Sequence, residues 1–184
     1  MNYLDKPLFD RLIAEASIKP RLKRELRFMA STEWMTKHDW LETELLAIAD
    51  RSGNKGVLLL APDDDLYILP YERSRGLAGQ KSGRTQPIIC DFCRTWQSGG
   101  AGSITFTKDR STVNSVSYLC CADLECSRNV RTKTAAATVS RAQLREDLTD
   151  LQRVERLKGR LRELIARFEL SPARTMTLPK TKTD

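Results

Sequence analysis

Histidine is nearly absent from this chain, which has one in 184 residues, His38. Histidine is the side chain best suited to acid and base catalysis at neutral pH, but His38 lies in a helix-like stretch between Lys37 and Asp39. No serine or cysteine occupies a nucleophile-elbow context, and no Gly-Lys-Ser/Thr ending follows the glycine-rich stretch that ends at Gly102. We therefore expect that the protein is not an enzyme.

Long apolar runs are also missing. The longest, Val57–Ala61, is far short of the ~20 residues that span a bilayer. The first residues, Met-Asn-Tyr-Leu-Asp-Lys-Pro, lack the basic and apolar segments of a secretory signal. We expect a cytoplasmic protein with no membrane contact and no small-molecule substrate.

Cysteine is scarce, yet four of the five cysteines form two spaced pairs. Cys90 and Cys93 form a C-x2-C pair, and after a gap of 27 residues Cys121 and Cys126 form a C-x4-C pair. In a reducing compartment, paired cysteines are more often metal ligands than disulfides. Four thiolates complete the tetrahedral shell of a structural Zn²⁺, so the sequence predicts one zinc ion with these four ligands.

The fifth cysteine leaves an alternative for the third ligand. Cys120 and Cys121 are adjacent, and neighbours on a strand point to opposite faces, so only one of them faces the metal. Cys121 is the preferred ligand because it gives the tighter spacing to Cys126, and Cys120 is the alternative.

The chain around the cysteines predicts an α+β protein. Strand-like stretches at 102–108 and 115–119 form a hairpin between the two pairs, and a helix is expected after Cys126. Knuckle, hairpin and then a helix that carries the last ligand is the order of a treble-clef zinc finger.

The remaining elements are expected as follows. Residues 1–50 form an N-terminal helical part, whose third helix begins near Ser31 or Thr32 and supplies Trp34, Trp40, Leu41, Leu45, Leu46 and Ile48 to the core. The second helix supplies Leu22, Leu26 and Met29. Residues 51–86 hold a hairpin, with strands at 57–61 and 66–71, and a linker. Residues 87–170 form the small antiparallel zinc-finger domain, and residues 171–184 form a disordered tail.

A C-terminal helix is expected to close the finger domain. Leucines recur at helical spacing, and capping boxes occur at Thr149–Gln152 and Ser140–Gln143, so either one long helix starts near 141 or a turn precedes a helix at 150–169. We prefer the second. Its expected outer face holds Arg153, Arg156, Lys158, Arg160, Arg162 and Arg167.

The net charge of +7, from 31 basic against 24 acidic residues, suggests an anionic partner. Nucleic acid, the ribosome surface and an acidic protein all fit this charge. The basic residues of the expected finger helix and of the last helix support one hypothesis, a nucleic-acid-binding zinc module such as a ribosome-associated RNA binder or a small regulator.

The residues from Ser117 to Arg131, the upstream Cys-Asp-Phe-Cys, the glycine-rich turn and the leucine-rich last helix resemble the treble-clef proteins that bind elongation factor G. This family is known for its fusidic-acid-resistance members. The likeness covers about 87–168. It implies Cys90, Cys93, Cys121 and Cys126 as zinc ligands.

The resemblance also implies a function and a partner surface. A family member of this kind binds elongation factor G, modulates its release from the ribosome and, in resistance members, protects against fusidic acid. The family's partner surface uses aromatic and basic side chains near the zinc, and the matching positions are Phe92, Arg94, Trp96, Tyr118, Arg128 and Arg131. Phe92 and Tyr118 fit a core position equally well.

Overall fold

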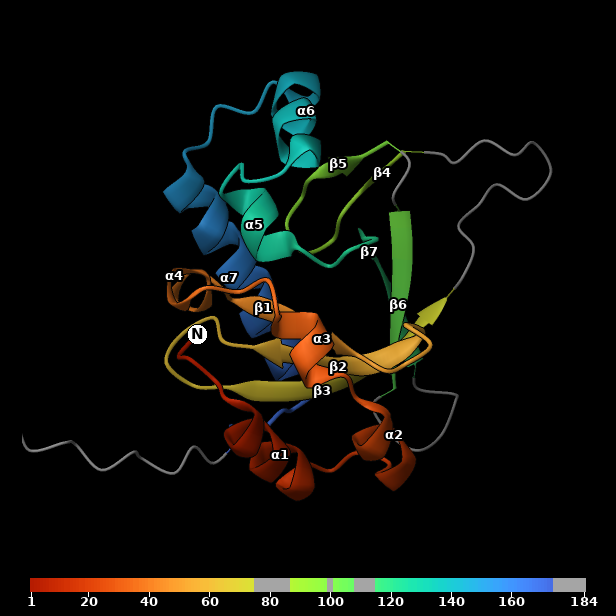
Figure 1. Ribbon diagram of the computed structural model, residues 1–184. Coiled ribbons are helices and arrows are strands. Elements are labelled where there is room, and N and C mark those ends of the chain that lie inside the picture. Colours follow the sequence, from red (N-terminus) through yellow and green to blue (C-terminus); the bar gives the residue numbers. More distant parts are fainter. Residues whose placement is uncertain (75–86, 99–100, 108–114, 174–184) are drawn as a thin grey trace, which may run out of the picture.

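The computed structural model describes residues 1–74, 87–98, 101–107 and 115–173, and it confirms an α+β fold. The elements, labelled in Figure 1, are α1 (Lys6–Glu15), α2 (Pro20–Glu25), α3 (Phe28–Thr32), α4 (Lys37–Leu41), β1 (Leu45–Ala49), β2 (Lys55–Leu60), β3 (Tyr67–Ser74), β4 (Ile88–Ile89), β5 (Trp96–Gln97), β6 (Ala101–Thr107), β7 (Ser115–Cys121), α5 (Cys126–Val130), α6 (Ala135–Leu144) and α7 (Asp150–Arg167).

The main sheet has five antiparallel strands in the order β1-β2-β3-β6-β7. Both predicted hairpins belong to it, and β3 joins them by pairing Glu72 with Thr105 of β6. The sheet therefore crosses both expected boundaries, at 50/51 and at 86/87, and contains strands from all three parts of the chain. Strands β4 and β5 form a separate two-stranded sheet beside the cysteines.

Helices cover both faces of the main sheet, so the molecule has three layers (Figure 1). On one face, Phe9, Leu12 and Phe28 from the N-terminal helices pack with Leu46, Ile48, Val57 and Leu59. On the other face, the cysteines and α7 pack with Leu45, Leu58, Leu60 and Ile104. Strand β2 is buried on both faces, which explains its unbroken apolar sequence.

The prediction that the N-terminal part is helical throughout residues 1–50 was wrong, because Leu45–Ala49 is strand β1. This stretch contributes to both cores, Leu45 to one and Leu46 and Ile48 to the other. A short apolar run that is buried on both faces has no period that separates strand from helix. Antiparallel pairing with β2 along the whole stretch decides in favour of strand.

Three apolar residues of the N-terminal part were predicted to lie in the core but are exposed. Trp34, Leu41 and Met29 are 42%, 69% and 61% exposed, whereas Trp40 is buried as expected. The helices there are short, with α3 and α4 of five residues each, so the apolar residues do not stay on one continuous stripe.

The C-terminal segment contains two helices. Helix α7 begins where the capping box predicts, with the Thr149 side chain accepting from the Gln152 amide and the Gln152 side chain accepting from the Thr149 amide. The second predicted capping box is wrong: Ser140 lies inside α6, which begins after Thr134, whose side chain accepts from the Ala137 amide.

The remaining expectations are a linker up to residue 86 and a disordered tail. Residues 75–86 and 174–184 lie outside the described residues. In the part that is described, no helix is both long enough and apolar enough to span a membrane.

Candidate metal centre

Four cysteine sulfurs meet between the small sheet and helix α5. The Sγ atoms of Cys90, Cys93, Cys121 and Cys126 all lie within 4.8 Å of one another, and all four residues are buried. The Sγ atoms of Cys90 and Cys126 are 3.8 Å apart, and those of Cys93 and Cys121 are 3.5 Å apart. In a tetrahedral zinc site with Zn–S bonds of ~2.3 Å, neighbouring sulfurs are about 3.8 Å apart, so the cluster fits zinc.

Local backbone geometry brings each pair together. In the first pair, the Arg94 amide donates to the Cys90 carbonyl and the Cys90 amide donates to the Thr95 carbonyl, at 3.0 Å each. Arg94 has φ 61°, a left-handed conformation that turns the chain back after Cys93. In the second pair, Leu124 has φ 59°, and its amide donates to the Cys121 carbonyl at 3.1 Å. Cys126 is then the first residue of α5.

Side-chain amides point at one of the sulfurs. Asn129 Nδ2 and Gln97 Nε2 lie 3.2 and 3.3 Å from Cys121 Sγ, and the Thr95 hydroxyl lies 3.1 Å from Cys93 Sγ. The two amides are donors of the kind that stabilise a thiolate and orient it as a ligand. Hydrogen bonds from the neighbouring thiols lower the pKa of Cys93 well below its ordinary value of 9.0.

Cys120 lies outside the cluster. It is buried beside Cys121 on β7, a strand on which neighbouring side chains point to opposite faces. Burial raises the pKa of its thiol to about 12. At neutral pH it is therefore a protonated, apolar core residue. This is the position that the preferred ligand assignment expected for it.

The knuckle is tied to the main sheet. The Asp91 amide donates to the Leu119 carbonyl at 2.8 Å, and the Leu119 amide donates to Asp91 Oδ2 at 2.7 Å. The first cysteine pair is thus held against the strand that carries the second pair. With four thiolates in its shell, a bound zinc would supply a cross-link and no open coordination position.

Helix α5 is locked to strand β1 by two residues. The Ser127 hydroxyl accepts from the amides of Glu44 and Leu45 at 2.9 and 3.1 Å. Arg131 forms a two-pronged ion pair with Glu44, with N–O distances of 2.9 and 2.6 Å. The two side chains are only 15% and 5% exposed, so Arg131, a predicted partner-binding residue, is committed to an internal contact.

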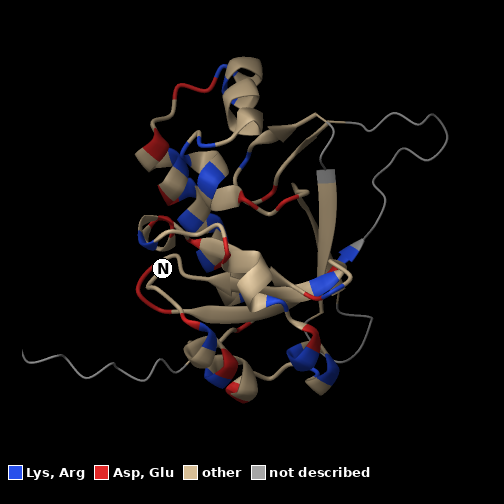
Figure 2. Ribbon diagram, viewed as in Figure 1, with Lys and Arg blue, Asp and Glu red and all other residues tan. Residues whose placement is uncertain are grey.

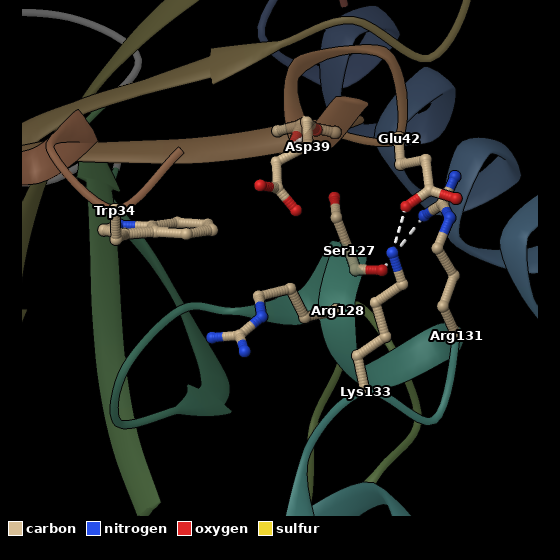
Figure 3. A pocket seen from close by; sticks show the side chains of 8 residues that line it. Trp34, Asp39, Glu42, Ser127, Arg128, Arg131 and Lys133 are labelled. Carbon is tan, nitrogen blue, oxygen red and sulfur yellow. Dashed lines mark hydrogen bonds and ion pairs between the residues drawn. The ribbon is translucent and has the colours of Figure 1, made fainter. Parts of the chain in front are cut away.

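Arg128 points the other way from the same helix, as Figure 3 shows. Its guanidinium lies 5.2 Å from the Trp34 ring centroid and pairs with Glu125 at 2.7 Å. The hollow lined by Trp34, Arg128, Arg131 and Lys133 has a volume of about 10 Å³, room for about one water molecule.

The other predicted partner-binding residues differ in exposure. Phe92 is 2% exposed and stacks on Tyr118, with ring centroids 5.6 Å apart. Tyr118 is half-buried, and its hydroxyl accepts a hydrogen bond from Arg167. Arg94 and Trp96 are half-buried at the knuckle. Phe92 therefore belongs to the core, while Arg94 and Trp96 reach the surface.

Arg153 was expected on the outer face of α7, but it is 3% exposed. Its guanidinium donates to the Asn129 carbonyl at 2.6 Å. The side chain of the same residue, Asn129, contacts Cys121. Sequence reasoning missed Arg153, Asn129 and Ser127 as parts of the site. Their partners are 24 or more residues away or lie on another element, so no local pattern identified them.

Ile89 is a further residue that the sequence did not single out. It lies directly opposite Trp96 in the β4–β5 pair and is 37% exposed. Directly opposite residues share one face of a sheet. Ile89 and Trp96 therefore form an apolar pair at the surface of the knuckle.

Comparison with known proteins identifies one family. A family model described as FBP C-terminal treble-clef zinc-finger matches residues 15–168. No curated protein matches, and no solved structure matches. The matched range includes the four cysteines, the main sheet and α7.

Proposed function

Because this chain belongs to the family of the FBP C-terminal treble-clef zinc finger, we propose that it is a zinc-binding protein that associates with translation elongation factor G and modulates its release from the ribosome. The observation that carries the proposal is the closed four-cysteine centre within a chain of this family. The resemblance of the finger to the elongation factor G-binding proteins names the partner.

The role of the zinc in this proposal is structural. All four candidate ligands are buried protein thiols, so water and substrate have no place in the shell. The ion would hold the knuckle, the end of β7 and helix α5 in one geometry. We propose that the protein works by binding and not by catalysis.

The candidate partner surface lies at the knuckle. Trp96 and Ile89 are an adjacent surface pair, and Arg94 follows Cys93 in the left-handed turn. Aromatic residues and arginines are the usual anchors of protein interfaces. Arg128 with Trp34 forms a second aromatic and basic pair at the surface. We assign Arg94 and Trp96 to the interface first, and Arg128 second.

Binding is tested by calorimetric titration of the full chain with elongation factor G from the same cell. Trp96→Ala and Arg94→Ala should each weaken binding about tenfold, a loss of ~1.4 kcal/mol. Lys37→Ala is the matched control, since Lys37 is an exposed cation on α4, and it should leave binding unchanged. Wild-type protein with full zinc content and no measurable binding would refute the proposal.

Release is tested separately on ribosomes stalled by fusidic acid. The wild-type protein should speed the dissociation of elongation factor G from these complexes, and Trp96→Ala should do so less. Protection of translation against the drug follows only if release is accelerated. Tight binding with no effect on release would support elongation factor G as the partner and refute the proposal that the protein modulates its release.

A nucleic-acid-binding module built on the finger helix and the last helix has less support. The cations of these elements are largely paired with carboxylates, as in Arg128–Glu125, Arg131–Glu44, Lys133–Glu42, Arg156–Glu146, Arg160–Glu163 and Arg162–Asp63. Paired cations leave little net positive charge for phosphates.

A further inference from the structure

A group of basic side chains with few carboxylate partners lies at the end of the molecule formed by α2 (Figure 1). Residues 19–27, which contain α2, hold five basic side chains and one acidic side chain. The turn between β1 and β2 adds Arg51. We call this set the basic face: Lys19, Arg21, Lys23, Arg24, Arg27 and Arg51.

Few carboxylates neutralise this face. Within the described ranges, Lys19, Arg24, Arg27 and Arg51 form no ion pair, and all four are exposed. Only Arg21 has an acidic partner there, the exposed Glu25 at 2.8 Å.

The fold places the turn beside α2. Leu26 and Asp50 form an isolated antiparallel bridge, and the Arg27 amide donates to the Ala49 carbonyl at 2.8 Å. Arg27 and Arg51 each follow one member of this bridge. Asp50 is the nearby acid, and its carboxylate accepts from the Ser52 hydroxyl and the amides of residues 54 and 55. Figure 2 shows Lys and Arg on α2 and on the adjoining ends of the strands.

We propose that the basic face binds the phosphodiester backbone of nucleic acid. Four of its six cations are arginines, whose planar guanidinium matches the geometry of phosphate oxygens. The cations are spread over one helix and one turn, and a nucleic-acid backbone likewise carries its negative charges separately, one on each phosphate.

Two other anionic partners fit less well. An anionic membrane surface calls for an apolar helix face that inserts, but Phe9, Leu12 and Ile13 of α1 and the half-buried Leu22 and Leu26 face the core. A protein interface is anchored by aromatic side chains and is depleted of charge at its centre, and the basic segment 19–27 contains no aromatic residue.

This inference is independent of the proposed partner of the finger. The basic face belongs to the layer whose apolar residues pack with Ile48, Val57 and Leu59. The cysteine cluster packs on the opposite face of the same sheet. One molecule has room for a protein on the finger and a nucleic acid on the basic face.

The test is fluorescence anisotropy with labelled duplexes of about 20 base pairs, RNA and DNA of the same sequence, between about 50 and 200 mM KCl. The variant Arg24→Ala/Arg27→Ala/Arg51→Ala removes three cations of the face. The control Lys37→Ala/Arg145→Ala/Arg160→Ala removes three exposed cations elsewhere, so both variants have the same net charge. Thermal unfolding and zinc content verify that both are folded.

The face variant should lose roughly tenfold or more in affinity. Its log–log salt slope should fall by about 2 to 3, near one per lost phosphate contact. The control should stay within about twofold of wild type, and Glu25→Gln, which frees Arg21, should tighten binding. Comparing the affinities for the RNA and DNA duplexes shows whether the face binds RNA, DNA or both.

Three results would overturn the proposal. Equal losses in the two triple variants would show attraction by net charge alone. Unchanged affinity in the face variant would place binding elsewhere. Binding to phosphatidylserine vesicles without binding to either duplex would identify a membrane surface as the ligand of the face. None of these outcomes depends on elongation factor G, so the two proposals succeed or fail separately.

Discussion

Replacing Arg131 with methionine separates a structural role from a partner-binding role for this residue. Its guanidinium forms two hydrogen bonds to the Glu44 carboxylate and a third to the Ser127 carbonyl at 3.0 Å. Methionine keeps the apolar stem and removes all three. The Glu44 carboxylate, with its side chain 5% exposed, then lacks its cation.

The magnitude follows from burial. Removing one partner of a buried ion pair costs ~3–5 kcal/mol, and because the Arg131 side chain is 15% exposed we expect the lower end, ~3 kcal/mol. For a chain of this size, that lowers the unfolding midpoint by ~6–12 °C. Urea unfolding gives the free energy, and calorimetry gives the midpoint.

The double variant Arg131→Met/Glu44→Leu is the control. With both charges gone, no buried charge is left unpaired, and most of the lost stability should return. A single variant that unfolds within ~0.5 kcal/mol of wild type would refute the structural role. If that stable variant also failed to bind elongation factor G, Arg131 would belong to the partner surface.

Three other predictions follow from the fold. Prolonged chelation of zinc should expose the finger to proteases, because structural zinc contributes on the order of 10 kcal/mol to such sites; a metal-free protein that resists proteolysis would contradict the site. Cys121→Ser should abolish stoichiometric zinc, measured by atomic emission, whereas Cys120→Ser should keep the metal and lose ~1–3 kcal/mol in urea unfolding; the reverse pattern would exchange their roles. Gly56→Ala should destabilise by ~2 kcal/mol or more, because the new Cβ would lie 2.3 Å from the Ile48 carbonyl oxygen; unchanged urea unfolding would mean that β1 shifts freely.

Sequence alone predicted the features that depend on local spacing. The two cysteine pairs bring their own ligands together through short turns, and the leucines and the Thr149 capping box fix the start of α7. The hairpins on either side of the linker were also predictable, because turn residues separate their apolar strands. These signals hold whatever the rest of the chain does.

Only the tertiary structure decided the features that depend on distant residues. Strand β1 is a strand because β2 pairs with it and helices cover both of its faces. Arg131 is internal because Glu44, 87 residues earlier, lies against it, and Arg153 is buried because the Asn129 carbonyl accepts from it. The sequence shows an arginine at each of these places. Which carboxylate or carbonyl meets it, and hence which cations stay free for a partner, depends on how the chain packs.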